Sequence, residues 1–228
     1  MILEPVGEDI WVVDGPEILF LGLTVGTRMT VVRLGEELWV HSPVSITNEM
    51  EAEIERLGKI RYIVAPNRYH HIFLPEWRSK FPEAEIFAAP GLTEKRPDIA
   101  FDGELTNTGQ YNWSGTLPHA IFGPSRLFDE VVFFHTPSRT LILTDLIVNV
   151  KTDGYSWWQK LFAAFDGLGY PDGTTPRLYR WSIKSKSAAK AIYQVMIDWE
   201  PEKIVISHGE WFREGGTKEL TKRLGWVF

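Results

Sequence analysis

The stretch IVAPNRYHHIF, which runs from Ile63 to Phe73, joins an apolar segment to two adjacent histidines. Its first residues, up to Ala65, are typical of a buried strand, and a proline follows them directly. The pair His70-His71 comes next, in what reads as the loop after that strand. Because the chain has only six histidines, two of them side by side at a strand end mark a candidate functional site.

Two other apolar segments end in a similar way. Residues 141–144 lead to Asp145, and residues 204–207 lead to His208. In layered α/β proteins, sites gather at the carboxyl ends of strands, so three such ends would bring these groups together. Imidazole nitrogens and a carboxylate suit zinc, and also iron or manganese. Taken singly, each residue has a structural explanation, such as a turn cap for Asp145, so the hypothesis rests on their shared position.

The remaining pattern alternates strands and helices. We expect strands near residues 10–13, 29–34, 38–40, 61–65, 85–89, 130–134, 141–144 and 203–206, and helices near 48–57, 74–80 and 185–199. This order is typical of an α/β fold in which sheets are buried between other layers. With no repeat or linker in the sequence, we predict one domain over residues 1–228.

An aromatic insertion at about 150–183 interrupts this pattern. Its core, YSWWQKLFAAFDGLG, spans Tyr155 to Gly169 and reads as a helix. Three interpretations remain open: a lid over a pocket, a dimer surface, or ordinary cover for the core.

Composition narrows the classes of partner and compartment. The net charge is −6, and the 24 Lys and Arg are scattered, which argues against a nucleic-acid partner. Without cysteine, disulfides and cysteine-based zinc sites are excluded. The N-terminus has no signal-peptide pattern, and no apolar stretch approaches the roughly 20 residues of a membrane span. We therefore expect a cytoplasmic protein with no membrane partner, and a homodimer is left open.

Taken together, these motifs resemble the metallo-β-lactamase superfamily. Its signature is H-x-H-x-D-H, followed by a distant histidine, an aspartate after a strand and a late histidine. His70 falls at the aspartate of the signature and His71 at its final histidine. Asp145, in SRTLILTDLI, matches the metal-bridging aspartate, and His208, in VISHGE, matches the last histidine. The resemblance implies a four-layer αββα sandwich with metal at one edge of two packed sheets.

The sequence also departs from that signature. The first two signature histidines are replaced by Pro66 and Arg68, and the region of the distant histidine reads GPSRLFDEVV. All three ligands of the family's first metal site are therefore absent. The resemblance implies at most one divalent ion, with zinc first and iron or manganese as alternatives.

The leading functional hypothesis is a hydrolase-like enzyme acting on a small-molecule substrate. One ion, held by His70, His71, Asp145 and His208, would activate water against an ester, amide, thioester or phosphoester. Four protein ligands would fill a tetrahedral zinc ion, whereas a catalytic ion needs an exchangeable position. The alternative is therefore a non-catalytic member of the fold that binds a ligand or partner, with a structural ion or no metal.

Two catalytic helpers complete the hypothesis. Arg68 is expected to place a fixed positive charge near the substrate, unless it pairs with Glu76 or Glu130. Glu210 is the expected general base, with Glu130 as the alternative.

Overall fold

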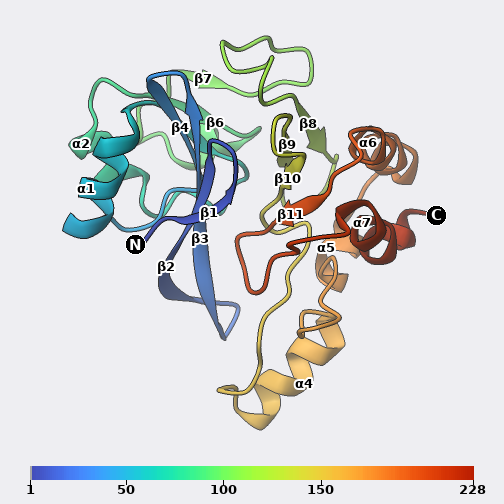
Figure 1. The fold of residues 1–228 in the computed structure, drawn as a ribbon. Coiled ribbons are helices and arrows are strands. Elements are labelled where there is room, and N and C mark those ends of the chain that lie inside the picture. The colour runs from blue at the N-terminus through green and yellow to red at the C-terminus, as the bar shows by residue number, and fades with distance from the viewer. Residues whose placement is uncertain (1) are drawn as a thin grey trace.

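The computed structural model describes residues 2–228, which form two β-sheets with helices on their outer sides (Figure 1). The larger sheet contains, in spatial order, β1 (Glu4–Gly7), β2 (Ile10–Phe20), β3 (Leu23–Leu34), β4 (Glu37–His41), β5 (Lys59–Ala65), β6 (Glu85–Ala88) and β7 (Gly103–Glu104). The smaller sheet has the order β11 (Lys203–Val205), β10 (Thr140–Ile142), β9 (Glu130–His135) and β8 (His119–Phe122).

The helices complete four layers. Their bounds are α1 (Asn48–Leu57), α2 (Leu74–Lys80), α3 (Leu92–Lys95), α4 (Trp157–Asp166), α5 (Arg177–Ser182), α6 (Lys186–Asp198), α7 (Gly216–Leu224) and a 3₁₀ turn, η1 (Gly225–Val227). Figure 1 shows α1 and α2 on one side of the molecule and α6 and α7 on the other. Among the described residues, no helix is long and apolar enough to cross a membrane.

Alternation along the strands explains the layers. In β4, Leu38 and Val40 pack with α1 and α2 on the outer face of the larger sheet. Trp39, between them, packs in the core between the two sheets, with residues of β9 and β10. Side chains of successive strand residues point to opposite faces, so an unbroken apolar strand serves two cores. The predicted αββα order is therefore confirmed.

Helix boundaries follow local signals closely. The α2 helix occupies the predicted residues, and α1 ends at Gly58 as expected. The sequence offers Asn48 as a cap for α1, but the cap is Thr47, one residue earlier, whose Oγ1 accepts from the Met50 amide at 3.2 Å.

The N-terminal hairpin is longer than predicted. The sequence places a turn at Asp14-Gly15, but β2 continues through an irregularity between Gly15 and Ile18 and pairs with β3 to the hairpin tip. A bulge of this kind lets a strand bend without ending. The extension carries Phe20, at the hairpin tip, well beyond the part of β3 that pairs with β4.

The aromatic insertion packs against this hairpin tip. Tyr155 Oη donates to the Thr24 carbonyl at 2.6 Å, and Gln159 Nε2 donates to the Gly22 carbonyl at 2.8 Å. A small separate apolar cluster, which includes Val25 and Ala163, lies beneath α4. In Figure 1, α4 lies apart from the two-sheet body. Only part of α4 therefore covers the core, since Trp157, Trp158, Leu161 and Phe165 are exposed.

Parallel pairing brings the key strand ends to common edges. β4 and β5 run parallel in the larger sheet, and β10 and β11 run parallel in the smaller one. The loops that leave the carboxyl ends of these four strands carry the candidate site.

Candidate metal-binding site

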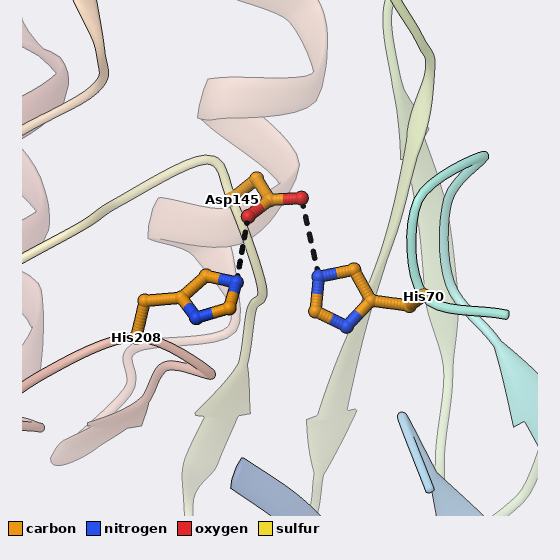
Figure 2. Close-up of side chains that lie close together, drawn as sticks. All are labelled: His70, Asp145 and His208. Atoms are coloured by element: carbon orange, nitrogen blue, oxygen red, sulfur yellow. Dashed lines mark hydrogen bonds and ion pairs between the residues drawn. The ribbon is translucent and has the colours of Figure 1, made fainter. Parts of the chain in front are cut away.

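Three side chains from distant parts of the chain converge on one point (Figure 2). His70 Nε2 lies 3.2 Å from Asp145 Oδ2, and His208 Nε2 lies 3.1 Å from Asp145 Oδ1. One potential ligand atom from each residue lies within 4.8 Å of the others. These three residues, the His–Asp–His group, include three of the four metal ligands expected from the sequence.

The loop that carries Asp145 is held from below by Glu130. Its fully buried carboxylate accepts backbone amide bonds from Thr144 at 2.8 Å, Asp145 at 2.8 Å and Leu146 at 2.9 Å. Burial, followed by the nearby Asp145 charge, raises the pKa of Glu130 to about 7. Glu130 thus holds the backbone of the Asp145 loop, and both of its carboxylate oxygens are engaged in these bonds.

Asn67 links the Asp145 loop to the histidine loop. Its Nδ2 donates to Asp145 Oδ2 at 2.8 Å, and its Oδ1 accepts from the Tyr69 amide at 2.8 Å. The side chain is fully buried. One amide therefore fixes the position of His70 relative to the carboxylate that it faces.

Ser42 orients His70 from the other side. Its Oγ lies 2.6 Å from His70 Nδ1, and its own backbone has φ +54°, in the left-handed region that a non-glycine residue seldom adopts. Such strain is tolerated where surrounding contacts determine the conformation, and it is frequent at functional sites. Hydrogen bonds of this type to the second ring nitrogen fix the orientation of a metal-binding histidine.

His208 has a tautomer set by its surroundings. Its Nδ1 lies 2.7 Å from the Gly26 carbonyl, which can only accept, so Nδ1 carries a proton. In neutral His208, the Nε2 lone pair would then face a carboxylate oxygen at 3.1 Å. Burial acts to lower the pKa of His208, but the hydrogen bond and charge of Asp145 outweigh it and the pKa is raised. The pair therefore requires a cation between these atoms, either a proton or a metal ion.

The turn after His208 depends on a glycine. Gly209 has φ +90°, and a Cβ added there would lie 2.0 Å from the Asn149 carbonyl oxygen. Arg28 Nη1 donates to the carbonyls of Ile206 and Gly209, at 2.9 and 2.6 Å. These contacts explain why His-Gly follows the last strand.

Burial and charge favour an ionised Asp145. Burial alone would raise the pKa of this carboxyl, but His70 and His208 hold the pKa well below its ordinary value. A carboxylate between two imidazoles is the donor set that binds a divalent ion.

His71, the fourth expected ligand, lies outside the His–Asp–His group. Arg96 Nη1 donates to His71 Nδ1 at 2.7 Å, and because arginine has no acceptor, His71 carries its proton on Nε2. Burial, followed by the charges of Lys95 and Arg96, lowers the pKa of His71 to about 4. The two adjacent histidines thus have different partners, although both line the same cavity.

The two expected catalytic helpers are also placed apart from the group. Glu210 forms an ion pair with Lys151 at 2.7 Å and lines a different cavity. Arg68 lines neither of the cavities beside the group, and its carbonyl accepts from Lys95 at 2.7 Å. The alternative pairing of Arg68 is absent as well, since Glu76 binds the Ile46 amide instead.

Sequence reasoning missed Ser42 and Asn67 as positioning residues. Each is a short polar residue within two positions of a strand end, Ser42 in the sequence HSP and Asn67 in the sequence PN. This position is the only local feature that could have identified them. His41, beside Ser42, is fully buried and stacks on Trp39, with neither ring nitrogen bonded among residues 2–228. The sequence left open whether His41 lines the cleft or only ends a strand, and the structure shows the second, because His41 is the last residue of β4 and lines neither cavity beside the group.

Two cavities meet at the His–Asp–His group. The first, of about 200 Å³, is lined by the group together with Ser42 and His71. The second, of about 570 Å³, shares Asp145 and His208 with the first but is otherwise mainly apolar. Phe20 and Tyr69 also belong to both linings, so the two cavities form one cleft.

Comparison with known proteins agrees with this architecture. Residues 7–161 match the family described as a domain of unknown function (DUF4336). The chain is similar to a solved metallo-β-lactamase from Pontibacter korlensis, with a TM-score of 0.67, 14% identity, and 99% of this chain and 97% of that chain covered.

Two further solved structures are similar over nearly the whole chain. The metallo-β-lactamase from Hirschia baltica has a TM-score of 0.65 at 14% identity, covering 99% of this chain and 96% of that chain. FIM-1 from Pseudomonas aeruginosa, solved in a mono-zinc form, has a TM-score of 0.62 at 18% identity, covering 98% and 94%. No curated protein matches. At these identities the likeness shows the fold, and the resemblance expected from the sequence is confirmed at that level.

Proposed function

The chain belongs to the family described as a domain of unknown function (DUF4336) and has the metallo-β-lactamase fold, and from this premise we propose that it is a metal-dependent hydrolase with one ion. His70, Asp145 and His208 would hold the ion, with zinc first and iron or manganese as alternatives. The substrates expected from the sequence are small esters, amides, thioesters or phosphoesters.

One observation carries this proposal. His208 donates from Nδ1 to Gly26, so its Nε2 lone pair is directed at the Asp145 carboxylate. A proton or a metal ion is required there, and the residues present fit a divalent ion, because two imidazole nitrogens and a carboxylate oxygen lie within 4.8 Å of one another. With His71 bound to Arg96, three protein ligands remain, and a position stays open for water or substrate.

The chemistry divides between the ion and the chain. When bound, the ion supplies Lewis-acid activation of a water molecule and of the bond to be cleaved. Ser42 and Asn67 hold His70 in place, while Glu130 holds the loop of Asp145. His71 lines the same cavity with a protonated Nε2, which gives it an N–H to donate there.

Metal content tests the proposal directly. Elemental analysis is made on protein purified without an affinity tag or added metal, for the wild type, His208→Ala and the control His119→Ala, whose ring binds the Thr106 carbonyl elsewhere. We expect about one ion per chain in the wild type and the control, and none in His208→Ala. Equal metal in all three proteins, or none in the wild type after incubation with zinc, would overturn it.

A second candidate function uses the same residues without a metal ion. Ser42 Oγ, His70 and Asp145 lie in series, at 2.6 and 3.2 Å, which is the order of nucleophile, base and carboxylate in serine hydrolases. The strained backbone of Ser42 favours this candidate further.

Two measurements separate the candidates. A chelator removes the activity of a metal-dependent hydrolase but leaves that of a serine hydrolase. A fluorophosphonate labels a serine nucleophile, because the Oγ–P bond forms as fluoride leaves and the histidine takes the hydroxyl proton. Mass spectrometry then shows whether Ser42 carries the label. If the protein has neither metal nor activity, the result supports a non-catalytic protein.

A further inference from the structure

The larger cavity beside the His–Asp–His group has a mainly apolar wall. Leu23, Val25, Val148 and Leu168 are buried in this wall, and Phe128 and Tyr179 stack at 4.4 Å between ring centroids. At about 570 Å³, the cavity has the size of a binding site for a small organic ligand.

Most of the few polar groups in the wall already have partners. Asp166 accepts from the Leu178 amide at 2.9 Å, and Ser182 Oγ donates to the Tyr179 carbonyl at 2.7 Å. Arg126 is exposed at the rim. A polar ligand group would therefore lose its hydrogen bonds to water and find few partners inside, whereas an apolar group has no such bonds to lose.

The opening of this cavity is apolar as well. Trp181 and Leu21 line it while remaining 63% and 65% exposed, and Leu127 is exposed beside them. Exposed apolar side chains that surround a cavity mark a site for an apolar ligand.

Aromatic rings connect this cavity to the reacting centre. Tyr69, which directly precedes His70, contacts Phe20 at 5.3 Å and Phe128 at 5.2 Å between ring centroids. Because Asp145 and His208 line both cavities, a ligand that fills the apolar one has its end at the group.

From this continuity we infer that the substrate is an ester or thioester of an apolar acyl group, whose chain occupies the apolar cavity and whose carbonyl lies at the His–Asp–His group. This inference rests on the proposed hydrolase function and names its substrate class. In the reaction, the oxygen of water bonds to the carbonyl carbon and the bond to the leaving oxygen or sulfur breaks. The leaving group takes a proton from the water, and a carboxylic acid is released.

The test is a chain-length series of p-nitrophenyl esters, from acetate through butyrate and octanoate to decanoate, with zinc-loaded protein and all esters below their micelle concentrations. Each buried methylene contributes about fourfold in kcat/KM, so the activity is expected to climb steeply along the series. An equal kcat/KM for acetate and decanoate would overturn the inference while leaving the hydrolase proposal intact.

Two variants change the cavity in opposite directions. Leu178→Trp, in α5, fills it and is expected to remove most of the preference for decanoate over acetate. Phe162→Ala, in α4, enlarges it and is expected to move the optimum to longer chains. Val195→Trp is the matched control, because Val195 is exposed on α6 and outside this cavity. A decanoate preference unchanged in both cavity variants would overturn the assignment.

A binding measurement separates failure of the inference from failure of the hydrolase proposal. If no ester is hydrolysed, calorimetric titration with decanoic acid replaces the assay. Decanoic acid should bind the wild type, and its affinity should fall at least tenfold in Leu178→Trp but not in Val195→Trp. This result supports the apolar binding site independently of hydrolase activity. No binding to the wild type, or equal binding to all variants, would overturn it.

Discussion

The polar and apolar halves of the cleft are built from different parts of the fold. The polar half lies at the carboxyl ends of sheet strands, where buried bonds from Asn67 and Glu130 fix the loops. The apolar half lies between the extended hairpin and the insertion with α4 and α5, and it is held by packing of a small cluster. Under the proposed function, the reacting groups are therefore fixed by the sheets, while the ligand is selected by the hairpin and the helical insertion.

The largest expected effect distinguishes the adjacent histidines of the polar half. His70→Ala should lose the ion and all metal-dependent hydrolysis, because it removes one of three ligands. His71→Ala should keep about one ion per chain, since His71 is bonded to Arg96. Elemental analysis and ester hydrolysis check both variants. If His71→Ala also loses its ion, the four-ligand site expected from the sequence is right and the three-ligand site is wrong.

His41, the last residue of β4, behaves as part of the apolar core although it is polar. Burial, followed by the charge of His70, lowers its pKa to about 3, against 6.5 in the unfolded chain. Between pH 3 and pH 6.5, His41 binds a proton in the unfolded chain but not in the folded chain. The free energy of unfolding therefore falls as the pH falls from 6.5 towards 3. The slope from this residue is about 1.4 kcal/mol per pH unit.

The variant His41→Leu removes this contribution. Urea unfolding between pH 6 and pH 4, with chelator in both proteins, should show a shallower loss of stability in the variant. The difference between the two slopes isolates the contribution of His41. Identical slopes would show that His41 is accessible and belongs to the polar half.

A smaller effect is expected where the two polar loops are joined. Asn67→Ala leaves the Tyr69 amide without its partner and removes one of the two hydrogen bonds at Asp145 Oδ2, which should lower the free energy of unfolding by about 1–3 kcal/mol. Loss of such an orienting group should also weaken zinc affinity by about 10- to 100-fold. Chemical denaturation and a competition titration measure the two effects. The control is Asn112→Ala, an exposed residue that donates to Tyr62 Oη, and it should leave zinc affinity unchanged.

The smallest effect tests the apolar half. Trp157 and Trp158 are exposed on α4, and Trp158 lies against Gly22 at the hairpin tip. Replacing both by alanine should raise the KM of a decanoate ester by about two- to threefold, since Trp158 packs against the hairpin tip, whose Phe20 and Leu21 line the cavity. Light scattering should give the same mass for the variant and the wild type. A lower mass for the variant would instead identify α4 as a dimer surface.

The sequence predicted most elements because their signals are local. Helix α2 occupies the predicted residues, and the strands near residues 61–65 and 203–206 lie within about two residues of their predicted limits. The long hairpin was missed because its continuation past Gly15 depends on pairing with β3. A turn signal in the sequence of one strand gives no information about the neighbouring strand, whose pairing can continue the strand through that turn.

Sequence also identified the strand ends that carry the site, and three of its residues. It did not separate His70 from His71, or exclude Glu210, because the direction of a side chain in a loop depends on its tertiary partners. Arg96 binds one histidine, Ser42 binds the other, and Lys151 pairs with Glu210.

By itself, then, the sequence determined the layered α/β fold and the set of polar residues at strand ends, since periodicity and strand length are encoded locally. Only the tertiary structure decided which polar residues meet and where the apolar cavity opens. The physical reason is that proton positions, as on His208 and His71, follow from a carbonyl or guanidinium contributed by a distant segment. The cavity likewise exists only where the hairpin tip and the insertion pack beside the loops of the two sheets.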